Sequence, residues 1–172
     1  MKITKAELIE LAACRNGLNR FIAQTNNTDE PVEVSSLVGG KNTHEDLLWL
    51  AGKKLPKDRI VRFACDCALL NNKLIEPYTY KYDLIVEFLR NPTAARAGAR
   101  TAARAGVRAT ACAATRAAGW AAGAADAAYA AYTSTYATGA AWAAGWAAGT
   151  TACAAAAENR DKVNELLRGL FA

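Results

Sequence analysis

Arginine recurs at every fourth position in one part of this chain, on a background of alanine and glycine. Four residues advance about 400° around a helix, so such side chains share one side and their row winds slowly. Guanidinium groups at this spacing repel one another and need an anion opposite, and their planar fork matches carboxylate or phosphate. The predicted stripe consists of Arg96, Arg100, Arg104 and Arg108, whereas Arg116 has rotated to another side.

The anion can come from the chain itself, and the sequence leaves this alternative open. Carboxylates on neighbouring helices could pair with the stripe, since arginines inside proteins are commonly matched in this way. The acidic residues in question are Asp58, Asp66, Asp83 and Glu87.

The anion can also be a phosphate of a bound nucleotide, with aromatic rings holding the base. Small residues around a large ring leave open volume for such a ligand. The rings could equally fill the space that alanine leaves in a core. The tryptophans considered for the site are Trp120, Trp142 and Trp146.

The distribution of charge favours a small anion over nucleic acid. The chain carries 21 Lys and Arg against 16 Asp and Glu, a net charge of +5. Between positions 90 and 116 there are six arginines and no acid, so all of the excess positive charge lies in one segment. A basic helical face also suits nucleic acid, but no lysine lies between Lys81 and Lys162, and the surrounding alanine and glycine predict burial.

Groups that could carry out catalysis are few, and we expect a protein that is not an enzyme and has no cofactor. His44 is the only histidine, and no nucleophile elbow or phosphate-binding loop motif is present. Asp126, an isolated acid in an apolar segment, is explained equally well as a base or as a partner of Arg116. Cys65 and Cys67 would point to opposite sides of a helix, so no metal site is expected.

The cysteines and the first residues predict a cytoplasmic protein. The five cysteines are scattered and odd in number, and the stretch MKITKAELIELAAC carries acids where a signal peptide would be apolar. The least charged segment, 117–157, consists of Ala, Gly and Thr with almost no Leu, Ile or Val, so we expect no membrane span.

Periodicity predicts helices along most of the chain. Thr4 and Glu7 form a capping-box pattern, and Asn42-Thr43 offers a second cap. Residues 26–42 have turn composition, with a short VEV that could be extended. The helices are expected at 5–24, 44–55, 56–70, 80–90 and 158–172.

Roughly half of residues 94–157 are alanine, which favours helix over disorder. Each glycine in this segment costs about 1 kcal/mol in a helix, so we expect close approach of another element to compensate. Repeated WAAG and TACAA strings indicate two similar helices packed as a hairpin, with the bend at TSTY, positions 133–136.

The sequence therefore predicts an all-α, single-domain helical bundle over residues 1–172, with a long Ala/Gly-rich C-terminal helical hairpin. Residues 1–91 would form an N-terminal helical layer and residues 92–172 an Ala-rich helical layer. Exposed small-residue faces would leave an apolar patch, so we expect a homo-oligomer.

The segment DLLWLAGKKLPKDRIVRFACDCA and the Ala-rich region after it resemble the Imm-5-like family of immunity proteins of bacteria and phages. This resemblance implies an all-helical, non-enzymatic protein that protects against a toxin or defence system, and it supplies no site residues. The residues that carry it are Asp46, Trp49, Leu50, Phe63, Ala64, Cys67 and Ala68.

Three functional hypotheses follow from the sequence. The first is a neutralising protein, of immunity or phage counter-defence type, that sequesters an anionic nucleotide signal. The second is direct inhibition of a protein toxin or effector through a helical face or the loop at 26–42. The third is an enzyme that acts on a nucleotide.

Overall fold

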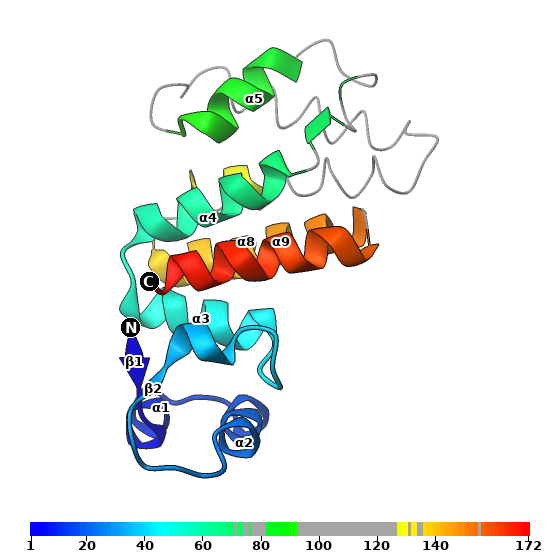
Figure 1. Ribbon diagram of the computed structural model, residues 1–172. Coiled ribbons are helices and arrows are strands. Elements are labelled where there is room, and N and C mark those ends of the chain that lie inside the picture. Colours follow the sequence, from blue (N-terminus) through cyan, green and yellow to red (C-terminus); the bar gives the residue numbers. More distant parts are fainter. Residues whose placement is uncertain are drawn as a thin grey trace.

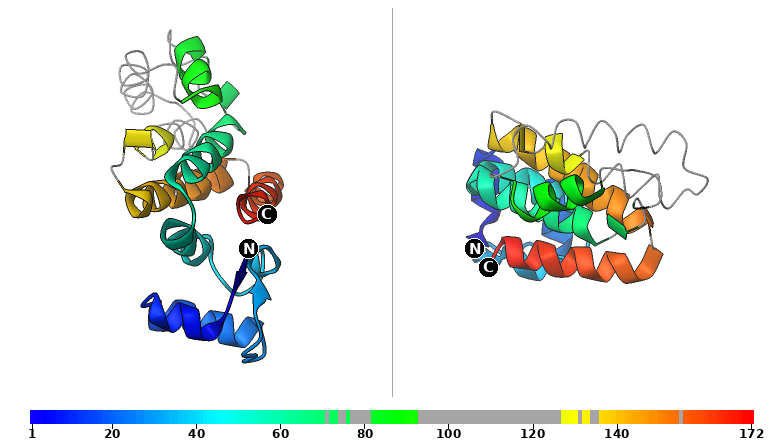
Figure 2. Two further views of the ribbon diagram at one scale, coloured as in Figure 1. Left: turned by 90° about the vertical axis from the view of Figure 1, so that its left-hand side faces the viewer. Right: turned by 90° about the horizontal axis from the view of Figure 1, so that it is seen from above.

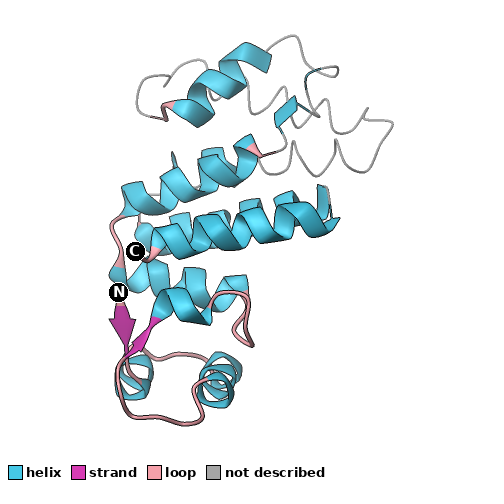
Figure 3. Cartoon of the chain, in the orientation of Figure 1, coloured by secondary structure: helices cyan, strands magenta, loops and turns pink. Residues whose placement is uncertain are grey.

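The computed structural model describes residues 1–70, 72–73, 76, 82–92, 127–130, 132–133, 136–154 and 156–172. Over these residues the chain is mostly helical, which confirms the all-α prediction in outline (Figure 3). The strands described are a single antiparallel pair, β1 (Lys2–Ile3) with β2 (Val32–Glu33). No described helix is both long enough and apolar enough to cross a membrane.

The helices are stacked in layers (Figure 1). The α1–α2 pair lies at one end, followed by α3, then α8 with α9, then α4, and α5 lies at the other end. Their bounds are α1 Lys5–Glu10, α2 Arg15–Gln24, α3 His44–Lys54, α4 Lys57–Leu69, α5 Tyr82–Arg90, α8 Ala137–Ala154 and α9 Ala156–Leu170, with a 3₁₀ helix, η1, at Val34–Leu37.

The prediction of one continuous first helix is wrong, because the chain breaks it into α1 and α2. The predicted capping box is present: Glu7 N donates to Thr4 Oγ1 (3.2 Å) and Thr4 N donates to Glu7 Oε2 (3.0 Å). The helix then ends, Ala12 adopts a left-handed φ of 59°, and α2 begins after Cys14, whose Sγ accepts a hydrogen bond from Gly17 N (3.3 Å). Left-handed backbone at alanine leaves no trace in hydrophobic periodicity, so the sequence did not reveal the break.

The segment at 26–42 is more ordered than a plain loop. Its predicted extended piece forms β2, in which Glu33 pairs with Lys2 and Val32 with Ile3. Val34 and Leu37 of η1 are buried, so this segment contributes to the core.

Helices α3 and α4 follow the predicted pattern closely. Thr43 caps α3 and forms a capping box with Asp46, and Pro56 lies directly before α4. The predicted apolar face of α4 is confirmed, and all its members are buried: Ile60, Phe63, Ala64, Cys67 and Ala68.

Helix α8 is the centre of the bundle, because it packs against α3, α4 and α9 (Figure 2). Alanine side chains let neighbouring helices approach closely, and here the buried ones lie on one face of the helix. The buried alanines are Ala140, Ala141, Ala143, Ala144, Ala147 and Ala148. Tyr136 lies in a bend directly before α8, at the predicted TSTY break, whereas the first arm of the predicted hairpin falls mostly outside the described residues.

Two glycines of α8, Gly145 and Gly149, are not explained by close approach of another element. A Cβ added to Gly145 would lie 3.7 Å from Leu48 Cδ1, an ordinary contact distance. At Gly149 no described atom lies within 4 Å of the added Cβ. The expected compensation by tight packing is therefore not found at these two positions.

Helix α9 closes the bundle and brings the two ends of the chain together. Its side chains Val163, Leu167 and Leu170 are buried. The amino group of Met1 donates a hydrogen bond to the carbonyl oxygen of Phe171 (2.8 Å), so β1 is tied to the end of α9.

Candidate functional site

Most of the predicted site lies outside the described residues, so the structure does not test it. This applies to Arg96, Arg100, Arg104, Arg108, Arg116 and Trp120. Trp142 and Trp146 both lie on α8, and the side chain of Trp142 is likewise outside the described part. Trp146 is 57% exposed, so at least one predicted ring lies at the surface of the bundle.

The described residues carry no excess charge. They contain fifteen Lys and Arg and fifteen Asp and Glu, so the net charge of +5 comes entirely from the residues beyond them. The described part of the chain, called the scaffold below, therefore has no net charge without the arginine stripe.

One of the carboxylates considered as a partner for the stripe is already bound. Arg62 donates from Nε to Asp66 Oδ1 (3.0 Å), and its Nη1 donates to the carbonyl oxygen of Arg90 (2.8 Å). The other three, Asp58, Asp83 and Glu87, are exposed and form no ion pair with another described residue.

Burial makes the two free cysteines of α4 poor metal ligands and poor nucleophiles. Desolvation raises the pKa of the Cys65 thiol to about 12, and it raises the pKa of Cys67 further still. Within the described ranges, no three His, Cys, Asp or Glu side chains gather closely enough to hold a metal ion.

The single histidine has a structural contact. His44 is half-buried, and its Nε2 lies 2.8 Å from Asn164 Oδ1. This contact joins the start of α3 to α9, so His44 helps to hold the two helices together.

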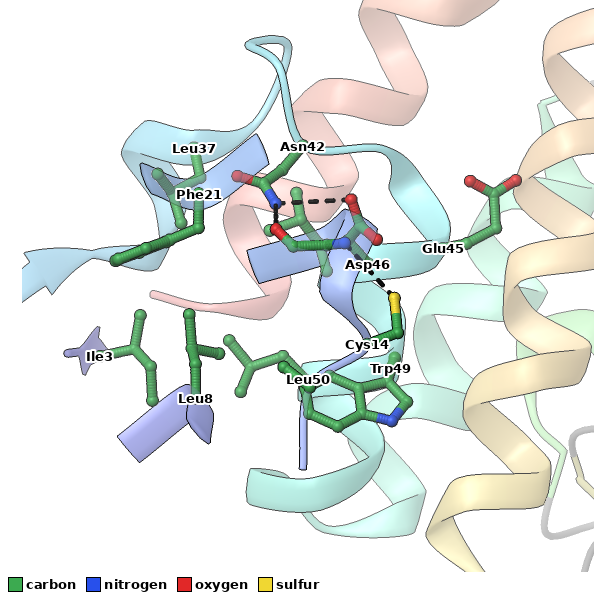
Figure 4. Close-up of a pocket in the computed structure, with 13 residues that line it drawn as sticks. Ile3, Leu8, Cys14, Phe21, Leu37, Asn42, Glu45, Asp46, Trp49 and Leu50 are labelled. Carbon is green, nitrogen blue, oxygen red and sulfur yellow. Dashed lines mark hydrogen bonds between the residues drawn. The ribbon is translucent and has the colours of Figure 1, made fainter. Parts of the chain in front are cut away.

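A cavity of about 220 Å³ lies between the α1–α2 pair and α3 (Figure 4). Most of its wall is apolar, from Ile3, Leu8, Phe21, Leu37, Leu47, Trp49 and Leu50. Its polar groups come from Cys14, Asn42, Glu45 and Asp46. Sequence reasoning missed this site, because its wall is assembled from β1, α1, α2, η1 and α3, and its polar residues have the local pattern of caps and turns.

Asp46 organises the polar side of the cavity. Its two carboxylate oxygens accept hydrogen bonds from Arg20 Nε and Nη2, both at 2.6 Å, and one also accepts from Thr43 N (3.0 Å). Burial raises the pKa of Asp46, but the bonds from Arg20 and Thr43 outweigh it and leave the pKa below the ordinary aspartate value. The carboxylate is therefore charged at neutral pH and already matched by a guanidinium.

Asn42 has one amide atom satisfied and the other not. Its Nδ2 donates to Gly17 O (3.3 Å) and to Asp46 Oδ2 (3.4 Å) (Figure 4). Both partners are acceptors, so the amide cannot be flipped without losing these bonds. The oxygen Oδ1 is buried, and no donor from the described part of the chain lies within hydrogen-bond distance of it.

A second hollow, of about 620 Å³, lies between α4 and α9. Phe63 and Leu166 contribute apolar surface, and Arg59, Asp66 and Glu165 bring charges of both signs. Arg59 Nη2 donates to Gly169 O (3.3 Å), which links the two helices across the hollow. Its mixed charge selects no particular ligand.

Comparison of the chain with protein-family models, with curated proteins and with solved structures gives no match. The resemblance to Imm-5-like immunity proteins therefore remains a prediction carried by the residues quoted for it.

Proposed function

We propose that this protein is a non-enzymatic neutralising protein, of immunity or counter-defence type, that binds and sequesters an anionic nucleotide. The arginine stripe would bind the phosphates, and tryptophan rings would stack on the base. The observation that carries the proposal is the separation of charge between the balanced, described scaffold and the arginine-rich segment.

The arrangement of acids in the scaffold supports a ligand over internal pairing. Asp66 is already engaged by Arg62. Asp58, Asp83 and Glu87 form no ion pair with another described residue, but their pairing with the stripe would leave the net charge of the chain at +5. A phosphate ligand supplies the missing negative charge from outside the chain.

Helix α8 offers a surface suited to a base. Trp146 is 57% exposed, and glycine rather than a larger residue lies near it on the same helix at positions 145 and 149. Stacking of a base on an exposed ring contributes about 1 to 3 kcal/mol.

The test is a series of thermal melts with cyclic and linear nucleotides. A ligand at about 100 times its Kd stabilises the folded state by about 2.7 kcal/mol, which should raise Tm by about 5 to 10 °C in a chain of this size. Arg100→Ala and Arg104→Ala should each remove the rise and leave the fold intact. Arg15→Ala, which changes an exposed arginine on α2, is the matched control and should keep the rise.

Three results would contradict the proposal. No shift with any nucleotide would favour direct binding of a protein effector instead. Unfolding of both arginine variants would show that these side chains are structural. Conversion of the nucleotide, detected by mass spectrometry after the protein is denatured, would make the protein an enzyme.

A further inference from the structure

We propose that the cavity between the α1–α2 pair and α3 binds a small uncharged aromatic molecule that carries one N–H or O–H donor. The residues of this site are not those of the proposed nucleotide site, and the proposal does not depend on the proposed function. It combines three observations: the size of the cavity, the charge of its wall and an unpaired acceptor in that wall.

The size and lining of the cavity define the body of the ligand. An apolar cavity of about 150 Å³ in another protein binds benzene, so the volume of about 220 Å³ here suits a fused pair of rings. Phe21 and Trp49 offer aromatic surface, and Leu8, Leu47 and Leu50 offer aliphatic surface. Burial of an apolar ring against these side chains is the main source of affinity.

The charges of the wall exclude an anion. Among the described residues, no Lys or Arg lines the cavity, the carboxylate of Asp46 is matched by Arg20, and Glu45 places an exposed carboxylate at its edge. A phosphate or carboxylate ligand would be repelled by Glu45 and would find no cation, which also distinguishes this site from the proposed nucleotide site.

Asn42 defines the polar group of the ligand. A buried acceptor without a donor is unfavourable, and the two bonds made by Nδ2 prevent the amide from flipping to relieve it. In Figure 4 the oxygen points toward the side of Phe21 and Leu37, which also line the cavity. The oxygen is buried, so a ligand reaches it only when the atoms that cover it move, and the new hydrogen bond offsets the cost of that movement.

The experiment is calorimetric titration of the full chain with indole and with benzofuran. Both have the same fused-ring shape, but benzofuran has an oxygen in place of the indole N–H. We expect one indole to bind per chain and benzofuran to bind at least about tenfold more weakly, since only indole can satisfy Asn42.

Two variants place the binding in the cavity. Asn42→Ala should bring the two affinities together, whereas Asn19→Ala, at an exposed position on α2, should leave the difference unchanged. Ala13→Leu adds bulk to the cavity wall and should weaken both ligands at least about tenfold. The control for added bulk is Ala6→Leu, at an exposed position on α1.

Each opposite result overturns the proposal. Absence of indole binding at low-millimolar concentration would show that the cavity takes no such ligand. Equal affinity for indole and benzofuran would show that Asn42 does not select a donor. Unchanged binding to the Ala13→Leu protein would place the ligand elsewhere, and this result remains informative if Asn42→Ala fails to fold.

Discussion

Substitution of Ala144 by leucine should destabilise the protein, whereas substitution of its neighbour Gly145 by alanine should stabilise it. Ala144 is fully buried on α8, which packs against both α3 and α4, so the larger side chain must push helices apart. Overpacking of this kind costs about 1 to 3 kcal/mol. At Gly145 an added methyl group would meet Leu48 Cδ1 at 3.7 Å, so the helix gains about 0.5 to 1 kcal/mol without a clash.

The two variants should therefore differ by roughly 1.5 to 4 kcal/mol in the free energy of unfolding. For a chain of this length the difference corresponds to melting temperatures at least about 3 °C apart. Urea unfolding followed by far-ultraviolet circular dichroism measures both free energies. Ala6→Leu, at an exposed position on α1, controls for the change of residue type alone.

An Ala144→Leu variant with an unchanged free energy of unfolding would refute the reasoning, because it would mean that α8 has room for a larger side chain between α3 and α4. Destabilisation by Gly145→Ala would refute the expectation that alanine at position 145 stabilises α8. In that case glycine would be required at this position by a contact other than that with Leu48.

Two further predictions concern titratable groups. Asp46 has a lowered pKa in the folded protein, so its contribution to stability is complete above the ordinary aspartate value and is lost as pH falls through the lowered one. Asp46→Asn weakens the pairing with Arg20, so it should lower the free energy of unfolding at pH 7, and the difference from the unmodified protein should shrink as the pH falls below about 4. Urea unfolding at several pH values measures this difference. A difference that stays constant across pH would contradict the role assigned to Asp46. Burial raises the pKa of Cys65 and Cys67. Iodoacetamide at about pH 8 should therefore alkylate exposed Cys14 of the native protein far faster than these two thiols, and peptide mass spectrometry measures the three rates. Similar rates at the three positions would contradict the burial of Cys65 and Cys67.

Local signals in the sequence predicted local structure well. The caps at Thr4 and Thr43 depend on hydrogen bonds to residues three positions away, so the pattern of residue types is sufficient to find them. The buried face of α4 was found for the same reason, since a helical stripe lies within a few turns. The break at Ala12 was missed because nothing in its residue type marks a left-handed turn.

Arrangement in space was harder to predict than the helices themselves. The alanines of α8 lie on one half of the helix, but Gly and Trp rather than charged residues lie on the other half, so periodicity does not mark the face that packs against α3 and α4. The cavity was missed because Asn42 and Asp46 become part of one wall only when α2 and α3 pack together. The arginine stripe remains a prediction.

The position of α8 has a consequence for biosynthesis. The surface of α3 that packs against α8 is translated about ninety residues before α8 itself. At ordinary rates of translation this interval lasts on the order of ten seconds, and during it the apolar face of α3 has not yet been covered by α8. The yield of folded protein in cells should therefore depend more strongly on chaperone supply and growth temperature than is usual for a chain of this size.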